Sequence, residues 1–373
     1  MTTPQLEAHP GPDLPSPVAR KPSTDPVRFR VRVRIRIRWA VVAAAAVVAL
    51  VAATGAVTDA ATTATAATAA AGGPVPHAAT SASVTKPAVP QHSAYLGAFV
   101  APHINEDQAQ ADVRLELAQL GNFDGAVGRS LGLVHVYQPW STPVRSSTLA
   151  ALAATGATPF IDWTCTSDAS IINGSQDALI TSYADSLKAY GRPVLLRWFW
   201  EMNLVNLPRT SGCLGSLGST GYIDAWQHIW TIFQNEGAAN VAFVWCPSIF
   251  GGTTSSAYYP GDSYVDWIGW DGYDRTHSAS ATIAQFLPFY TYWVTHGKPM
   301  VLGETGATTD QASYLDALAT ALPASFPQVH AVLYYDSKST SDWTLVDAPG
   351  DLGADQFATL AQTPYFGYPF VGS

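Results

Sequence analysis

From Tyr95 onward, short apolar segments alternate with longer amphipathic ones, and this alternation restricts the possible folds more than any other feature. Eight apolar segments occur, at residues 96–100, 133–137, 158–163, 193–201, 241–245, 265–270, 299–304 and 329–335. Most are followed by apolar residues at three- to four-residue spacing, which is typical of helices, but an irregular Gly/Ser/Tyr segment follows the fifth. Nearly continuous apolar strands that alternate with helices indicate a parallel sheet covered by helices.

Eight such units in roughly 280 residues predict an α/β fold, a (β/α)₈ TIM barrel that forms a single domain over residues 94–373. An open, doubly wound sheet is the alternative. No glycine-rich phosphate loop opens any of the expected helices, which weighs against that alternative.

The first ninety residues differ from the rest. Arginines alternate with other residues over 28–38, and an uncharged apolar run follows over 39–57. A basic segment before an apolar one is the layout of an export signal, so residues 1–57 are predicted to be a signal or anchor segment. Residues 58–93, rich in Ala, Thr and Pro, are expected to be a disordered linker. The protein is therefore expected to be secreted or, if 39–57 is uncut, tethered to the membrane at the cell surface.

The charge balance limits the partners. Of the chain's 19 basic and 28 acidic residues, 11 and 25 lie beyond residue 57. This acidic excess argues against nucleic acid as a partner. Low total charge together with 12 Trp and 16 Tyr instead suits an uncharged ligand recognised by stacking.

Acidic and aromatic residues gather where the predicted strands end. In (β/α)₈ barrels, functional groups lie at the carboxyl ends of the strands. Here those ends carry Trp140, Asp162, Trp163, Trp200, Glu201, Asn203, Trp245, Asp271, Tyr273, Glu304 and Asp336. Carboxyl groups beside large rings are the chemistry of a sugar-binding site.

Two of these residues, Glu201 and Glu304, close the fourth and seventh apolar segments. Hydrolysis of a glycoside needs one carboxylic acid to protonate the leaving oxygen, and a second carboxylate that attacks the anomeric carbon or activates water. Side chains from these two strands converge over the barrel axis, so a separation of ~5–5.5 Å, the retaining geometry, is expected.

Three motifs resemble glycoside hydrolase family 26, the β-mannanase family, and occur in the family's order. Residues 197–203, Arg-Trp-Phe-Trp-Glu-Met-Asn, resemble its acid/base strand. Residues 259–273 are similar to its sixth strand and lead-in, and residues 298–306 are similar to its nucleophile strand. One departure stands out: the family commonly has His immediately before the acid/base Glu, and here that residue is Trp200.

The resemblance implies double displacement, with Glu304 as nucleophile, Glu201 as acid and then base, and Tyr273 hydrogen-bonded to Glu304. Alternation along the fourth strand puts Arg197 and Phe199 on the face of Glu201, which predicts Arg197 beneath the carboxylates or in a purely structural ion pair. Asn203 is expected to contact a sugar hydroxyl or to cap a loop.

Further substrate contacts are expected from Trp200, from Asp271, and from four tryptophans near strand ends whose rings match the CH faces of sugars: Trp140, Trp163, Trp245 and Trp270. Four others are expected to pack in the interior: Trp198, Trp226, Trp230 and Trp293.

The cysteines and histidines indicate no metal or cofactor. Cys165 follows the third strand and Cys213 lies in the loop after the fourth, so a disulfide between these adjacent loops is predicted, with Cys246 a buried thiol. His103 and His135 are not expected to form a metal site with the carboxylates.

The sequence thus predicts a monomeric, secreted, retaining endo-β-glycanase that acts on a polysaccharide, with β-1,4-mannan the leading substrate. β-1,3-Xylan and β-glucan are alternatives. A catalytically inactive glycan-binding barrel and an envelope scaffold protein are the two other classes that remain open.

Overall fold

A computed structural model of the protein describes residues 85–104, 108–109, 112–142, 144–339, 341–345 and 352–367. The predicted signal or anchor segment at 1–57 lies outside these residues, as does most of the predicted linker. The end of the linker, 85–93, lies against the barrel: Lys86 Nζ is 2.7 Å from Asp266 Oδ1, and Tyr95 donates a hydrogen bond to the Ala88 carbonyl. None of the helices in the described ranges has the length and hydropathy needed to cross a membrane.

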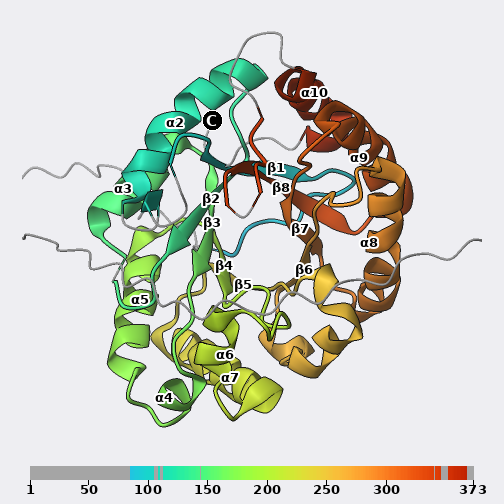
Figure 1. The fold of residues 1–373 in the computed structure, drawn as a ribbon. Coiled ribbons are helices and arrows are strands. Elements are labelled where there is room, and N and C mark those ends of the chain that lie inside the picture. The colour runs from blue at the N-terminus through green and yellow to red at the C-terminus, as the bar shows by residue number, and fades with distance from the viewer. Residues whose placement is uncertain are drawn as a thin grey trace, which may run out of the picture. The chain divides into compact units, whose positions relative to one another are not determined.

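Eight parallel strands form a closed barrel in which each strand pairs with the next and β8 pairs with β1 (Figure 1). The strands are β1 (Tyr95–Ala101), β2 (Leu133–Gln138), β3 (Thr158–Trp163), β4 (Val194–Trp198), β5 (Val241–Trp245), β6 (Trp267–Asp271), β7 (Met300–Thr305) and β8 (Val329–Ser337). The predicted (β/α)₈ fold is confirmed.

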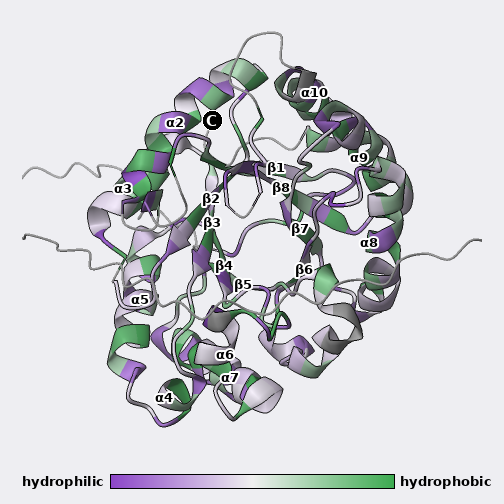
Figure 2. Ribbon diagram, in the orientation of Figure 1, coloured by the Kyte–Doolittle hydropathy of each residue, from purple (hydrophilic) through white to green (hydrophobic). Residues whose placement is uncertain are grey.

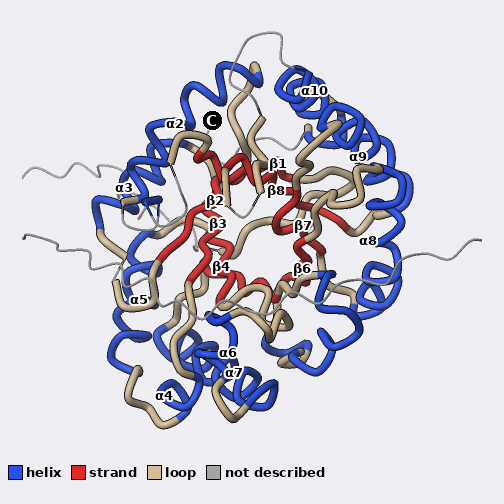
Figure 3. Tube along the Cα trace, in the orientation of Figure 1, coloured by secondary structure: helices blue, strands red, loops and turns tan. Residues whose placement is uncertain are grey.

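Helices surround this ring of strands (Figure 3). They are α2 (Val113–Val127), α3 (Ser146–Thr155), α4 (Asp168–Ile172), α5 (Asp177–Tyr190), α6 (Pro208–Leu214), α7 (Gly218–Glu236), α8 (Ala279–Trp293), α9 (Gln311–Ser325) and α10 (Leu352–Ala361). Short 3₁₀ helices complete the chain: η1 (Ile249–Tyr258), η2 (Asp262–Tyr264), η3 (Val294–His296) and η4 (Pro364–Phe366). The irregular segment expected after the fifth strand is η1.

Alternation along the strands divides the apolar residues into two layers. One set fills the barrel, with Leu133, Phe160, Leu195, Val301 and Leu333 among its members. The opposite set packs outward against the helices. Hydrophobic and hydrophilic residues alternate along the surrounding helices (Figure 2). The two apolar layers are the arrangement that a parallel sheet covered by helices requires.

Helix α7 illustrates how sequence spacing produces this outer layer. Its buried residues include Tyr222, Trp226, Ile229 and Phe233, which follow the three- to four-residue period of one helix face. The helix ends at Gly237, whose left-handed backbone (φ 71°) lets its N–H donate to the last turn.

Strand β4 ends earlier than the apolar segment predicts. The sequence is apolar to Trp200, but Phe199 has φ 46° and Glu201 has φ 54°, both in the left-handed region. That conformation cannot continue an extended strand, so β4 stops at Trp198. Two short helices that the sequence pattern does not reveal, α4 and α6, follow β3 and β4.

Candidate active site

A buried arginine organises the carboxyl end of the barrel. Arg197, on β4, points into the barrel and is fully buried. Its Nε donates to Asp162 Oδ1 at 2.6 Å and its Nη1 to Asp271 Oδ1 at 2.6 Å. Its Nη2 donates to both Asp162 Oδ2 and Glu304 Oε1. One guanidinium therefore links carboxylates from β3, β6 and β7, and these contacts are compatible with both roles predicted for Arg197.

Glu304, on β7, is held by hydrogen-bond donors on both carboxylate oxygens. Tyr273 donates to Oε2 at 2.6 Å, and Tyr137 on β2 donates to Oε1 at 2.8 Å. Arg197 also donates to Oε1. Hydrogen bonds on both oxygens fix the orientation of the Glu304 side chain. The predicted hydrogen bond between Tyr273 and Glu304 is present.

The residue before Glu304 has to be a glycine. A Cβ at Gly303 would lie 2.7 Å from Cys246 Sγ, 2.8 Å from Asp271 Oδ1 and 2.9 Å from Arg197 Nη1. A side chain at this position would therefore displace the ion-pair network that supports Glu304.

Burial and charge act differently on the acids in this network. For Asp162, burial alone would raise the pKa, but the charges of Arg197 and His135 and their hydrogen bonds bring the pKa below its ordinary value. For Asp271, burial raises the pKa well above its ordinary value, and Arg197 opposes that effect. Burial likewise raises the pKa of the Cys246 thiol, which lies 3.3 Å from Asp271 Oδ1.

Glu201 lies just beyond β4, partly buried at the barrel mouth. Its backbone N–H donates to the Cys246 carbonyl at 3.0 Å. Burial raises the pKa of Glu201 to about 6, and the charge of Glu304 adds to the effect. Arg209, Arg197 and a hydrogen bond with Ser248 oppose it. A carboxyl group with this pKa holds its proton in mildly acidic solution, which suits a general acid.

Trp200 lies in an aromatic cluster at the mouth, together with Tyr137, Tyr273, Tyr335 and Trp343. Two guanidinium groups lie over its ring, Arg209 at 4.4 Å and Arg197 at 5.5 Å from the ring centroid. Trp200 is buried by these neighbours, so in this structure it forms part of the wall behind Glu201.

Four tryptophans predicted to stack on sugars face away from the mouth, and for them the prediction is corrected. Trp163, Trp245 and Trp270 are fully buried, and Trp140 is nearly so. All four belong to the layer between strands and helices: Trp140 stacks on Trp163 with centroids 4.2 Å apart, and Trp163 stacks on Tyr183 at 4.1 Å. No ring face is left for a sugar. Trp198, Trp226 and Trp293 are buried in the same layer, as expected, and Trp230 packs against it.

Asn203 follows one of its two predicted alternatives, whereas the predictions for Asp271 and Phe199 are corrected. Asn203 is buried and braces a loop: its Nδ2 donates to the Ser248 carbonyl at 2.7 Å, and its Oδ1 accepts from the Ser248 N–H at 2.9 Å. Asp271 is fully buried, and one of its oxygens pairs with Arg197. Phe199 is on the outer face, 5.6 Å from the Tyr222 ring, because its left-handed backbone interrupts the strand alternation.

His135, Asp162 and Glu304 bring potential metal ligands within 4.8 Å of one another. A metal site that joins His135 to the carboxylates was not expected from the sequence. Arg197 Nη2 already lies among them, bonded to Asp162 and Glu304 and 3.4 Å from His135 Nε2. The guanidinium therefore occupies the space that a cation would take.

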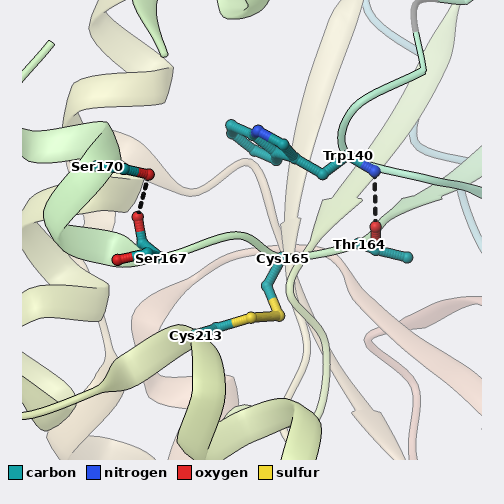
Figure 4. Close-up of a disulfide and its surroundings, with 6 residues drawn as sticks. All are labelled: Trp140, Thr164, Cys165, Ser167, Ser170 and Cys213. Atoms are coloured by element: carbon teal, nitrogen blue, oxygen red, sulfur yellow. Dashed lines mark hydrogen bonds between the residues drawn. A yellow bond between two sulfur atoms is a disulfide. The ribbon is translucent and has the colours of Figure 1, made fainter. Parts of the chain in front are cut away.

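The predicted disulfide is present. Cys165 and Cys213 are joined by a disulfide (Figure 4), and their Cα atoms are 6.0 Å apart. Cys246 is a buried free thiol. The bond ties the segment after β3 to α6, the helix that carries Arg209. It therefore restrains the loop from which Arg209 reaches Trp200.

Sequence reasoning missed several residues of the mouth. Tyr137 donates a hydrogen bond to Glu304, and Arg209 lies over the Trp200 ring. Arg275 lies over the Phe250 ring, 4.6 Å from its centroid. Tyr137 had a usable signal, since it is the inward neighbour of His135 by strand alternation. Arg209, on a short helix in a long loop, had none.

A closed (β/α)₈ barrel with two interacting glutamates at the ends of its fourth and seventh strands places the chain among the barrel glycosidases. The sequence model of "Glycosyl hydrolase family 26" matches residues 97–316. The chain belongs to this family.

Similar proteins vary in their named substrates. The chain is 30% identical over 251 residues to "Endoglucanase H" of Acetivibrio thermocellus, covering 62% of the chain and 28% of that protein. It is 25% identical over 149 residues to "Beta-1,3-xylanase TXYA" of Vibrio sp, covering 36% of the chain and 28% of that protein. The chain thus spans under a third of these relatives.

A solved β-mannanase of the family from Bacteroides ovatus superposes with a TM-score of 0.53 at 19% identity, covering 76% of this chain and 91% of that one. At this level of identity the likeness concerns the fold.

Proposed function

We propose that the protein is a retaining endo-β-glycanase in which Glu304 is the nucleophile and Glu201 the acid/base. The observation that carries the proposal is the difference between the two carboxyl groups. Three donors fix the orientation of the Glu304 carboxylate, whereas burial and the charge of Glu304 raise the pKa of Glu201 to about 6. Pairs of acids whose surroundings separate them in this way divide nucleophile and acid roles.

The reaction then proceeds in two displacements. Glu304 attacks the anomeric carbon while Glu201 gives its proton to the departing glycosidic oxygen, which leaves a covalent glycosyl–enzyme. Glu201, now ionised, takes a proton from water as that water attacks the same carbon and releases Glu304. Tyr137, Tyr273 and Arg197 keep the carboxylate of Glu304 aimed during both steps.

The proposed substrate is a β-linked polysaccharide, with β-1,4-mannan as the leading candidate from the sequence motifs. The names of the two curated relatives put β-glucan and β-1,3-xylan beside it. Trp200, in place of the usual histidine, lies against Arg209 and alters the wall next to the acid/base. This difference favours a comparison of several glycans over an assay on mannan alone.

The test measures reducing ends released by the purified protein from β-mannan, β-1,3-xylan, β-1,4-xylan and mixed-linkage β-glucan. Glu201→Ala and Glu304→Ala are run alongside. Glu236→Ala, at the end of α7 and remote from the mouth, is the matched control. We expect one polymer to be cleaved with retention at the anomeric centre, and activity to be lost in the first two variants only. Activity that survives Glu304→Ala would remove the nucleophile assignment, and silence on every polymer would favour a glycan-binding barrel.

Secretion is part of the same proposal. The Cys165–Cys213 disulfide supports an oxidising compartment, where such bonds form and persist. Mass spectrometry of the protein recovered from the culture medium would locate a cleavage site near residue 57. Recovery of the intact chain from the membrane fraction would instead support the anchored form.

A further inference from the structure

A second surface with the chemistry of a sugar site lies on the outer side of helix α8. Two hollows, of about 410 and 620 Å³, share Pro288 and Tyr292 as lining residues. Phe289 and Trp293 line the first hollow, and Leu287 lines the second. We call these two hollows and the Tyr292 side chain between them the α8 surface. None of its residues takes part in the network around Glu304.

Tyr292 is the most exposed large apolar side chain among the described residues, at 57%, and Leu287 is 47% exposed. The Tyr292 ring meets Trp293 edge-on at 4.9 Å. Within the described part of the chain, its hydroxyl group has no hydrogen-bond partner. An exposed aromatic ring with a free hydroxyl beside a concave apolar surface offers both a stacking face and a hydrogen-bonding group to a ligand.

The polar groups of the α8 surface are uncharged. Gln285, Ser255 and Ser256 line the first hollow, and Thr291 and Thr295 line the second. Neither hollow is lined by Asp, Glu, Lys or Arg among the described residues, in a chain with a net charge of −9. Hydroxyl and amide groups beside rings match a neutral pyranose, whose CH face stacks on an aromatic while its hydroxyls form hydrogen bonds. An anionic membrane or nucleic acid would require basic residues here.

The α8 surface is connected to the mouth through η1. Ser255 and Ser256 of η1 line the first hollow. Earlier in the same segment, Gly251 packs so closely on Asn203 that a Cβ at Gly251 would lie 2.0 Å from Asn203 Nδ2. Asn203 follows Glu201 by two residues. Different positions along η1 therefore meet the two regions: Ser255 and Ser256 line the first hollow, and Gly251 contacts the loop that follows Glu201.

We propose that the α8 surface binds a second stretch of the neutral polysaccharide whose other part occupies the mouth. Tyr292 supplies the stacking platform, and Gln285 supplies hydrogen bonds. This inference rests on the proposed substrate class but does not require that the mouth be active. Its effect is to hold the enzyme on long chains, without any effect on the cleavage of short ones.

The test compares the full-length protein with Tyr292→Ala and Gln285→Ala by electrophoresis through gels that contain each polymer of the panel. Leu115→Ala on α2, which removes a side chain 45% exposed and remote from both hollows, is the control. We expect the wild type and Leu115→Ala to be retarded by one polymer, and Tyr292→Ala to bind it about fivefold to tenfold more weakly. On that polymer, Tyr292→Ala should raise KM, with kcat on short oligosaccharides unchanged.

Two results would overturn the inference. One is retardation of Tyr292→Ala equal to that of the wild type. The other is a wild-type dimer in sedimentation that Tyr292→Ala converts to a monomer, which would make the surface an interface between copies. A protein that is retarded through Tyr292 but cleaves nothing would instead refute the proposed catalysis and leave this site standing. Circular dichroism checks that each variant is folded.

Discussion

Replacement of Arg197 by Met tests the central role given to this residue. Arg197 is fully buried and donates to three carboxylates, those of Asp162, Asp271 and Glu304. Removal of one partner from a buried ion pair costs about 3–5 kcal/mol, because the other charge is left uncompensated. With three partners we expect the upper part of this range. Since whole domains are stable by about 5–15 kcal/mol, this is a large fraction of the total.

The loss of folding stability in Arg197→Met should become smaller as the pH falls. In the wild type the folded-state pKa of Asp162 is lowered, so its contribution to stability is present above the unfolded pKa of about 3.9 and is lost as pH falls through the folded value. Without the guanidinium, burial dominates and the pKa of Asp162 rises. Protonation then favours the folded variant, so the stability difference between wild type and variant should narrow as pH falls from 8 to 5.

The assay is urea unfolding followed by tryptophan fluorescence at pH 8 and pH 5. With a slope of about 3 kcal/mol per M, a loss of about 5 kcal/mol lowers the midpoint by about 1.7 M at pH 8. Arg114→Met is the control, because Arg114 is 65% exposed and its ion pair with Asp112 is a surface one. Equal midpoints for wild type and Arg197→Met at pH 8, or a gap that widens toward pH 5, would refute the reasoning.

Three further predictions follow from the site. Glu201 must be protonated to act as an acid, and its pKa is raised to about 6, so kcat/KM should fall above about pH 6. Arg209→Gln removes a charge that lowers this pKa and should therefore move the fall in kcat/KM to higher pH; an unchanged pH profile would contradict the role of Glu201 as the acid. Tyr273→Phe removes a hydrogen bond to a charged oxygen, worth about 1.5–3 kcal/mol, and should lower kcat/KM about 10- to 100-fold in initial-rate measurements. An unchanged kcat/KM would contradict the assignment of Glu304 as the nucleophile. The double Ser variant lacks the Cys165–Cys213 disulfide, whose cysteines are 48 residues apart, and its free energy of unfolding in urea titrations should be lower by up to about 4 kcal/mol. An unchanged unfolding midpoint would show that other contacts fix the α6 loop.

The barrel and its two glutamates could be predicted because both depend on patterns that burial imposes on the sequence. Each strand is an apolar run long enough to lie between two hydrophobic layers. Glu201 and Glu304 end such runs, so their positions at the carboxyl ends of the strands could be located from the sequence. The disulfide was predictable because neighbouring strands bring their following loops together.

The direction of the tryptophans was not predicted, for a reason that can be stated physically. The position of a residue along a strand gives its height in the barrel. Whether its side chain points into the barrel or toward the helices depends on which of its neighbours in the strand points inward. Asp162 and Asp271 can be buried only inside the barrel, next to Arg197, so their neighbours Trp163 and Trp270 have to face outward. The positions of Asp162 and Asp271 could therefore have predicted that these tryptophans point outward. The left-handed backbone at Phe199 had no counterpart in the sequence, because it depends on contacts with other strands.

That backbone has a consequence for protein engineering. An L-residue in the left-handed conformation costs about 1–2 kcal/mol, so the bends at Phe199 and Glu201 persist only because other parts of the barrel hold them. Their N–H groups donate to the carbonyls of Trp163 and Cys246, each at 3.0 Å, from the ends of β3 and β5. A graft of the Trp200–Glu201 segment onto another barrel would therefore aim its carboxyl group correctly only if the two flanking strands were transplanted with it.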